Sequence, residues 1–160
     1  MADKRRFGLF ARFILERHGP CRVYDVAGGM GKLNQALTEL GCAATTFDTR
    51  HKHLPVCYQQ RRFDLDEPCE ADVVIGMHPD GATRVIIDYA ARWNIPFAIV
   101  PCCSDNGMPY KSWMRFLGEY AKNLGLTVEE QTLPMRGRAH VLLSGEKQND
   151  SPSVFVRENP

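Results

Sequence analysis

The residues of this sequence that could do chemistry stand directly after apolar runs that predict buried strands. A glycine-rich turn, Asp25-Val26-Ala27-Gly28-Gly29-Met30-Gly31, follows one run, and Asp48 ends the next. His78 and Asp80 follow a third run, and the pair Cys102-Cys103 follows a fourth. In a parallel sheet the carboxyl ends of the strands meet at one edge, where open α/β sheets bind ligands. We therefore expect these side chains to share one site.

The glycine-rich turn predicts close approach between backbone and ligand, because glycine has no Cβ and the first amides of the following helix face the ligand. The nucleotide P-loop does not fit, since Val26 and Leu33 stand where that motif needs Gly and Ser or Thr. The dinucleotide pattern G-x-G-x-x-G also fails, because Asn34 replaces its last glycine. A phosphate cradle is disfavoured, and NAD or FAD remains a minor alternative.

Two carboxylates distinguish this turn from other glycine-rich loops. Asp25 cannot favour a pyrophosphate, but it can support a cationic amino-acid cofactor that lacks phosphates. Asp48, at the end of the next predicted strand, can accept both hydroxyl hydrogens of a ribose. The simpler alternatives are a sheet-capping turn without a ligand for Asp25 and the glycines, and a helix cap or solvated turn acid for Asp48.

Together these residues resemble motif I and the ribose-binding acid of class I S-adenosylmethionine-dependent methyltransferases. The match is to D-x-(G/A)-x-G-x-G, with Ala27 at the first glycine position. Asp64 falls where such enzymes often place an acid near the adenine amino group, although an acidic loop residue is more often simply solvated. The resemblance implies S-adenosylmethionine as the cofactor, held by Asp25, Ala27, Gly28, Gly29, Gly31, Asp48, Thr49, Asp64, Leu65 and Met77.

The segment from Ile75 to Thr83, followed by Val100-Pro101-Cys102-Cys103, resembles a less common branch of this superfamily. That branch includes the methyltransferase domain of the Trm13-type transfer-RNA 2′-O-methyltransferases and related methyltransferase-like proteins. Pro79 stands where those relatives tend to have Cys, and this sequence has no counterpart of their zinc-binding modules. The resemblance spans roughly residues 22–133 and favours RNA as the substrate.

Methyl transfer is an in-line displacement at an activated sulfonium, so the protein chiefly aligns the reactants, sometimes with the help of a base. His78 and Asp80 are therefore candidates to orient or deprotonate a hydroxyl or amine of the substrate. Cys102 or Cys103 could instead attack a pyrimidine ring, as in enzymes that form 5-methylcytosine in RNA. The ordinary alternatives are turn hydrogen bonds for His78 and Asp80, and packing as small apolar groups for the cysteines.

The elements that must position these residues alternate along the chain. Apolar spacing predicts helices over residues 7–17, 33–40, 85–93 and 113–124, and strands over 22–26, 43–47, 56–63, 72–77, 97–100, 127–133 and 140–143. This alternation predicts an α/β fold: a Rossmann-like, mainly parallel seven-stranded sheet with helices on both faces and a hairpin made by the last two strands. We expect one methyltransferase-like domain over residues 1–145 and a polar, mobile tail over 146–160.

Composition limits the classes of protein that this chain can belong to. Its 160 residues are 44% hydrophobic and 24% charged, which is typical of one globular domain, and no apolar run could span a bilayer. The six cysteines form no Cys-x-x-Cys pair, so we expect reduced thiols and no metal site. The charged first residues are followed by helical spacing and not by a continuous apolar run, so we expect an intracellular protein, with the cytoplasm favoured over an organelle. The net charge of +1 permits nucleic-acid binding through local basic clusters at residues 4–6, 50–53, 61–62 and 136–138.

Two hypotheses about function follow. The first is a small S-adenosylmethionine-dependent methyltransferase, with RNA or a ribonucleoprotein favoured as substrate over protein or small molecules. The second is a catalytically silent methyltransferase-like module that binds a partner protein or a larger ribonucleoprotein assembly. The short chain favours the second, because no inserted segment is available to select a substrate.

Overall fold

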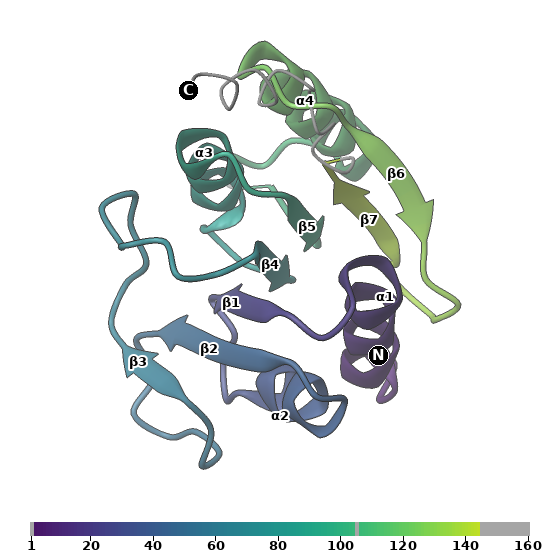
Figure 1. Cartoon of the computed structure of the whole chain (residues 1–160). Helices are drawn as coiled ribbons and strands as arrows, with labels where there is room; N and C mark the ends of the chain where they lie inside the picture. Colours follow the sequence, from purple (N-terminus) through teal and green to yellow (C-terminus); the bar gives the residue numbers. More distant parts are fainter. Residues whose placement is uncertain (1, 105, 145–160) are drawn as a thin grey trace, which may run out of the picture.

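A seven-stranded sheet in the order β3-β2-β1-β4-β5-β7-β6 forms the centre of the computed structural model, which describes residues 2–104 and 106–144 (Figure 1). β1, β2, β3, β4 and β5 run parallel, whereas β7 is antiparallel to both β5 and β6. The predicted mainly parallel sheet with a closing hairpin is confirmed. The strands are β1 (Arg22–Val26), β2 (Ala43–Asp48), β3 (Tyr58–Gln60), β4 (Val73–Met77), β5 (Phe97–Val100), β6 (Glu129–Thr132) and β7 (His140–Leu143).

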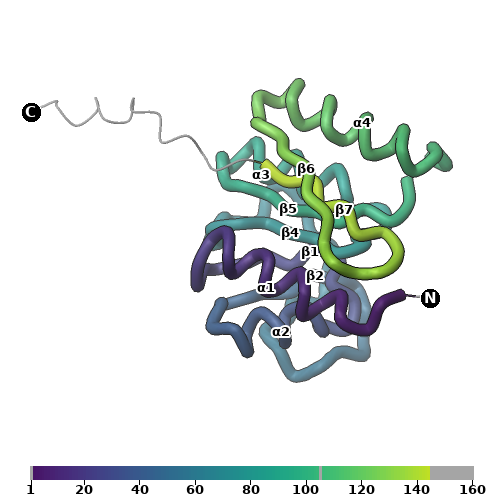
Figure 2. The backbone as a smooth tube through the Cα atoms, turned by 90° about the vertical axis from the view of Figure 1, so that its right-hand side faces the viewer, coloured from purple at the N-terminus to yellow at the C-terminus, as the bar shows by residue number. Residues whose placement is uncertain are grey.

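Helices cover both faces of the sheet, as predicted. They are α1 (Arg6–His18), α2 (Lys32–Glu39), α3 (Thr83–Trp93) and α4 (Tyr110–Asn123). α1 and α2 pack on one face through residues such as Ile14 and Leu37, and α3 and α4 pack on the other through residues such as Ile86 and Leu117. Figure 2 shows α1 in front of the strands in the turned view. No helix within the described part of the chain is long and apolar enough to cross a membrane.

The middle of the sheet is buried on both faces because its strands carry only apolar residues and glycine. Every residue of β4 and of β5 is buried, as expected for parallel strands with helices above and below. At the carboxyl end of β4 the chain leaves this apolar core and reaches His78, which is only half-buried. The sheet thereby fixes the position of the polar residues that follow each strand.

The third strand is shorter than the predicted run of 56–63. Only Tyr58–Gln60 pairs with β2, and β3 lies at the edge of the sheet with two exposed residues. On one side Val56 turns toward Gly31, and on the other Phe63 turns into a cluster of aromatic rings. Tertiary packing of these two side chains therefore ends the strand. The predicted tail over 146–160 lies outside the described residues.

The segment between β3 and β4 has no helix, and aromatic side chains hold it in place. The Phe63 ring lies 5.0 Å from that of Phe47 and 4.7 Å from that of Tyr89, measured between centroids. The Tyr24 hydroxyl donates to the carbonyl of Pro68 at 2.9 Å, and the Tyr89 hydroxyl donates to the carbonyl of Glu67 at 2.8 Å. These contacts fix residues 63–68 against the carboxyl ends of β1 and β2.

Candidate functional site

Two adjoining cavities open at the carboxyl ends of β1, β2 and β4. The strand order reverses at β1, which has β2 on one side and β4 on the other, and ligands bind at such points in open α/β sheets. The larger cavity has a volume of about 720 Å³ and the smaller one about 250 Å³. Ala27, Arg50 and His78 line both cavities, so the two form one continuous candidate site.

Two residues at this edge hold a left-handed backbone conformation without being glycine. Ala27 has a φ of 57° and His78 a φ of 51°, and they follow the neighbouring strands β1 and β4. Each extends the sheet by one hydrogen bond before it turns: the Ala27 amide donates to Phe47 and the His78 amide to Val100, both at 2.8 Å. Such conformations cost about 1–3 kcal/mol each and occur mainly at functional sites.

The glycine turn is as tight as its sequence predicts. A Cβ at Gly28 would overlap the Asp25 carboxylate and come within 2.6 Å of the Thr46 methyl group. A Cβ at Gly31, where φ is 91°, would lie 2.8 Å from Val56. Gly28 and Gly29 line the smaller cavity, whereas Gly31 is buried beneath Val56. The glycines therefore serve the packing of the turn as well as access to the cavity.

Asp25 lies beneath the glycine turn, not on the surface of either cavity. Its side chain is fully buried, its Oδ2 accepts a hydrogen bond from the Thr46 hydroxyl at 2.9 Å, and its Oδ1 has no partner among the described residues. Burial raises the pKa of Asp25 to about 7, against the lowering effect of the Thr46 hydrogen bond. The role predicted for Asp25 at the cofactor stays a prediction, and Asp25 would act from beneath the turn, because Gly28 lies against its carboxylate.

A buried polar network, which no pattern in the sequence predicts, lies under the turn. The Asn34 amide donates to the Thr46 hydroxyl at 3.0 Å and to the carbonyls of Ala44 and Cys57. Asn34 is the residue that breaks the dinucleotide motif, and here it joins α2 to β2 and, through Thr46, to Asp25. A polar residue on the inner face of a predicted helix was the available signal, but its partners come from distant strands.

Asp48 joins the glycine turn to the larger cavity. Its Oδ2 accepts from the Gly29 amide at 2.8 Å, its Oδ1 accepts from the Arg50 amide at 3.0 Å, and its side chain is 12% exposed. Each carboxylate oxygen has a second lone pair. Asp48 can therefore still accept hydrogen bonds from two neighbouring hydroxyl groups of a ligand.

The segment after β2 is fastened onto the same turn. The Leu54 amide donates to the Met30 carbonyl at 2.8 Å, and the Tyr58 hydroxyl donates to the Gly29 carbonyl. The ring of His53 stacks on that of Tyr58 with centroids 3.8 Å apart. Residues 49–57 thus follow the turn closely although they contain no helix or strand.

The two cavities differ in chemistry. Apolar side chains that include Phe47, Phe63 and Leu65 line the larger one. Its charged lining comprises three carboxylates and three arginines: Asp48, Asp64, Asp80, Arg50, Arg61 and Arg62. The smaller one is lined by three cations and no carboxylate, together with glycine backbone, His78 and the side chains of Phe7 and Met77; the cations are Arg6, Lys32 and Arg50. The larger cavity suits a planar nucleoside, and the smaller one suits a carboxylate. In the sequence, Arg6 belongs to a basic cluster but to no predicted cofactor site, and no motif singles out Lys32.

His78 and Asp80 stand at the edge of the larger cavity. The Nε2 of His78 lies 3.2 Å from the carbonyl oxygen of Arg138, and a carbonyl can only accept. Nε2 therefore carries a hydrogen, and the neutral ring keeps its lone pair on Nδ1. Burial lowers the pKa of His78, which favours this neutral form. Asp80 is exposed and accepts a hydrogen bond from the Cys103 thiol at 3.6 Å.

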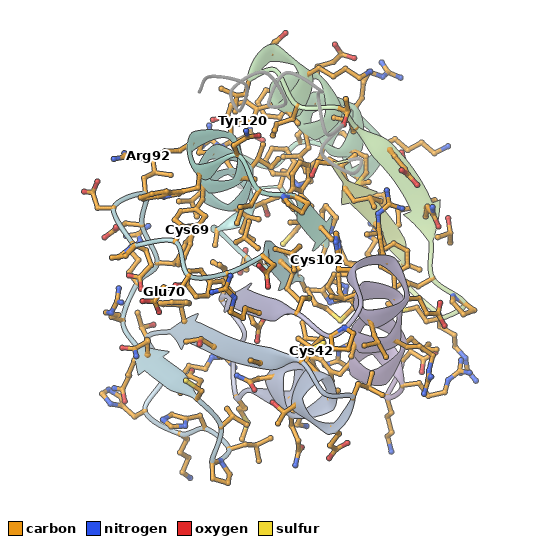
Figure 3. All side chains as sticks on the ribbon, in the orientation of Figure 1. Cys42, Cys69, Glu70, Arg92, Cys102 and Tyr120 are labelled. Carbon is orange, nitrogen blue, oxygen red and sulfur yellow. The ribbon has the colours of Figure 1, made fainter. Side chains whose placement is uncertain are left out.

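Cys102 and Cys103 reach the same edge of the sheet but line neither cavity. Cys102 follows β5 (Figure 3), and its Sγ lies 3.4 Å from that of Cys103. The hydrogen bond with Cys102, together with burial and the Asp80 carboxylate, raises the pKa of Cys103 to about 11. A raised pKa disfavours the thiolate, so this environment does not activate Cys103 as a nucleophile.

Most of the predicted site residues meet at the two cavities. The larger cavity is lined by Ala27, Asp48, Thr49, Asp64, Leu65, His78 and Asp80. The smaller one is lined by Ala27, Gly28, Gly29, Met77 and His78. Asp25, Gly31, Cys102 and Cys103 line neither. Within residues 2–104 and 106–144, no cluster of His, Cys, Asp or Glu could hold a metal ion.

One curated relative gives a match in sequence. The chain is 30% identical over 122 residues to a probable tRNA (uracil-O(2)-)-methyltransferase of Caenorhabditis elegans. The match covers 65% of this chain but only 19% of that protein, so the chain spans less than a fifth of its relative's length. No profile of a known protein family matches the sequence.

Solved structures match the fold over most of the chain. Precorrin-6y C5,15-methyltransferase from Geobacter metallireducens aligns with a TM-score of 0.61 at 12% identity, covering 89% of this chain and 87% of that one. The 1,6-didemethyltoxoflavin-N1-methyltransferase of Burkholderia thailandensis, solved with S-adenosylhomocysteine, aligns with a TM-score of 0.56 at 16% identity, covering 88% and 75%. The chain therefore has the fold of class I S-adenosylmethionine-dependent methyltransferases.

Proposed function

We propose that this chain binds S-adenosylmethionine in the two adjoining cavities and transfers its methyl group to RNA. The observation that carries the proposal is the division of one site into a nucleoside-like half and a carboxylate-binding half. Both cavities are lined by cations, but only the larger one has apolar aromatic walls and carboxylates such as Asp48, whereas the smaller one has no carboxylate and adjoins the glycine turn. S-adenosylmethionine has the same two halves, an adenosine and an amino acid.

The described residues fit this cofactor group by group. Asp48, held by the Gly29 amide, would accept hydrogen bonds from the ribose hydroxyls, and Asp64 would accept one from the adenine amino group. Arg6, Lys32 and Arg50 would hold the carboxylate of the amino-acid half. The unpartnered Oδ1 of Asp25 adds support, because a cation bound above the turn would favour the charged carboxylate and so oppose the burial that raises the pKa of Asp25 to about 7. When bound, the cofactor supplies an electrophilic methyl group.

His78 is the residue best placed to act on the methyl acceptor. Its free Nδ1 can accept the proton of a hydroxyl or amine, while the Arg138 carbonyl holds the ring in one orientation. Its lowered pKa keeps the base unprotonated at neutral pH. Asp80, which accepts a hydrogen bond from the Cys103 thiol, lines the same cavity and would help to position the acceptor. An RNA substrate is supported by the relative from Caenorhabditis elegans, which is named for transfer RNA.

Calorimetric titration with S-adenosylhomocysteine tests the cofactor site. Binding is expected, and Asp48→Asn should weaken it by about tenfold or more, since a hydrogen bond to a charged group contributes about 1.5–3 kcal/mol. Asp72→Asn is the matched control, because Asp72 pairs with Arg22 at the opposite end of β1. Absence of binding would refute the proposed cofactor.

Turnover separates the enzyme from the silent module. Transfer of a radiolabelled methyl group to total transfer RNA is expected for the wild-type chain and should be lost in His78→Ala. A chain that binds S-adenosylhomocysteine with wild-type affinity but methylates no RNA, alone or with a purified partner protein, would instead be a catalytically silent binding module. The two measurements together therefore decide between the two hypotheses.

A further inference from the structure

The four basic clusters of the sequence come together in two groups. Residues 50–53 follow β2 and residues 61–62 follow β3, and these two strands are paired in parallel with Asp48 opposite Gln60. The Gln60 amide also lies 2.7 Å from the His51 ring nitrogen. The two runs therefore leave the sheet side by side. We call them the strand rim: Arg50, His51, Lys52, His53, Arg61 and Arg62.

The other two clusters meet at the far side of the site. Asp3 accepts a hydrogen bond from the Arg136 amide at 3.2 Å through its carboxylate, and from the Arg6 guanidinium at 3.1 Å through its carbonyl. The loop between β6 and β7 thus lies against the start of α1, as Figures 1 and 2 both show. We call this group the loop rim: Lys4, Arg6, Arg136 and Arg138.

Carboxylates offset part of the charge of these rims, and one of them, Asp48, pairs with Arg50 at 3.9 Å. Asp3 is 7% exposed and pairs with Arg5, and Glu67 is 12% exposed and pairs with Arg61. Within the described part of the chain, the side chains of Lys4, Lys52, Arg62 and Arg136 form no ion pair with a carboxylate. These four side chains leave unpaired positive charge on both rims, although the whole chain has a net charge of only +1.

The two rims stand on either side of the candidate site. In the sheet order, β3 and β2 lie on one side of β1 and β4, and β7 and β6 lie on the other. Arg50 of the strand rim and Arg6 of the loop rim line the same small cavity. His78 lies between them, lining both cavities and bonded to Arg138 of the loop rim.

We infer that an RNA strand crosses the carboxyl edge of the sheet with its phosphates held on both rims, so that a nucleotide between them reaches His78. The inference rests on the proposed function and adds the surface that holds the substrate. Lys and Arg contacts to phosphate position a nucleic acid without reading its sequence. Such contacts release counterions and make binding steeply dependent on salt.

Single charge reversals test each rim without touching the cavities. Lys52→Glu alters the strand rim and Arg136→Glu the loop rim; Arg12→Glu, on the exposed face of α1, is the matched control. None of these residues lines either cavity. The probe is a fluorescein-labelled single-stranded RNA, with affinity measured by anisotropy over a range of salt concentrations. The single-stranded DNA of the same sequence is measured in parallel.

Each rim variant should bind RNA about tenfold more weakly. The plot of log affinity against log salt concentration, which has a negative slope, should become less steep by about 0.7 or more. The double variant should combine both losses, and Arg12→Glu should change neither quantity. The inference fails if the rim variants behave like Arg12→Glu or if the wild-type chain does not bind RNA. The DNA strand should show the same losses in the rim variants, because the rims contact phosphates, which both nucleic acids share. S-adenosylhomocysteine titration of the same variants distinguishes the two proposals. If the variants bind both cofactor and RNA as the wild type does, the role of the rims is refuted and the proposed cofactor site is not.

Discussion

Replacing Asp25 with Asn should remove one identifiable part of the pH dependence of stability. Burial raises the pKa of Asp25 from 3.8 to about 7. Below pH 3.8 the carboxyl is protonated in both folded and unfolded chains. Between pH 3.8 and 7 only the unfolded chain loses the proton, so the free energy of unfolding falls as pH rises. The loss reaches about 4 kcal/mol above pH 7, because a tenfold change in proton affinity corresponds to about 1.36 kcal/mol.

Urea unfolding at a series of pH values measures this effect, with the fluorescence of the buried Trp113 as a probe of the core. The stability of the wild type minus that of Asp25→Asn should fall between about pH 4 and 7 and stay constant above. Asp72→Asn is the control of opposite sign. Its hydrogen bonds with Arg22 lower the pKa of Asp72, so its contribution is present at neutral pH and is lost on acidification. A wild-type-minus-Asp25→Asn difference that does not change with pH would refute the reasoning.

Three further changes test the turn and the edge of the cavities. Gly28→Ala should destabilise the fold by about 1–3 kcal/mol and abolish S-adenosylhomocysteine binding, because its Cβ meets Asp25 and Thr46; Gly8→Ala, with open space around it, should be neutral or stabilising in the same urea titration. His78→Ala should lower kcat for RNA methylation by about 10²–10⁴-fold and leave the affinity for cofactor unchanged. Because the pKa of His78 is lowered, wild-type activity should reach its plateau at a pH below 6.5, the ordinary pKa of histidine. Full turnover in the variant would exclude a catalytic role. Cys103→Ser should keep wild-type turnover in the same methylation assay, and a covalent adduct with RNA seen on a denaturing gel for the wild type but not for the variant would contradict this.

The fold could be predicted from the sequence because each strand and helix has its own local signal. Val73–Met77 is a continuous apolar run, and the glycine turn is followed by Leu33 and Leu37 at helical spacing. The end of β3 could not be predicted, because Phe63 leaves the strand to pack among aromatic rings that come from other elements. Local pattern therefore predicted the existence of this element but not its length.

Some residues of the candidate site could likewise be predicted from the sequence, and others could not. Asp48 and His78 could be predicted to lie at the cavity because the ends of parallel strands share an edge. Arg6 and Lys32 could not, since they reach the smaller cavity only through the packing of α1 and the start of α2 beside the turn. Cys102 and Cys103 show the opposite case: they lie at the predicted edge, yet their side chains stay outside both cavities.

The attachment of residues 49–57 to the glycine turn links the two binding events that we propose. This segment carries Lys52 and His53 of the strand rim, and Leu54 bonds to the turn that would hold the cofactor. A ligand that shifts or orders the turn must also shift or order residues 49–57. In the same way, an RNA held by the strand rim on this segment must affect the turn. Affinities coupled in this way are reciprocal: if cofactor tightens the binding of RNA by some factor, RNA tightens the binding of cofactor by the same factor. The total free energy of binding both ligands is then the same whichever ligand binds first.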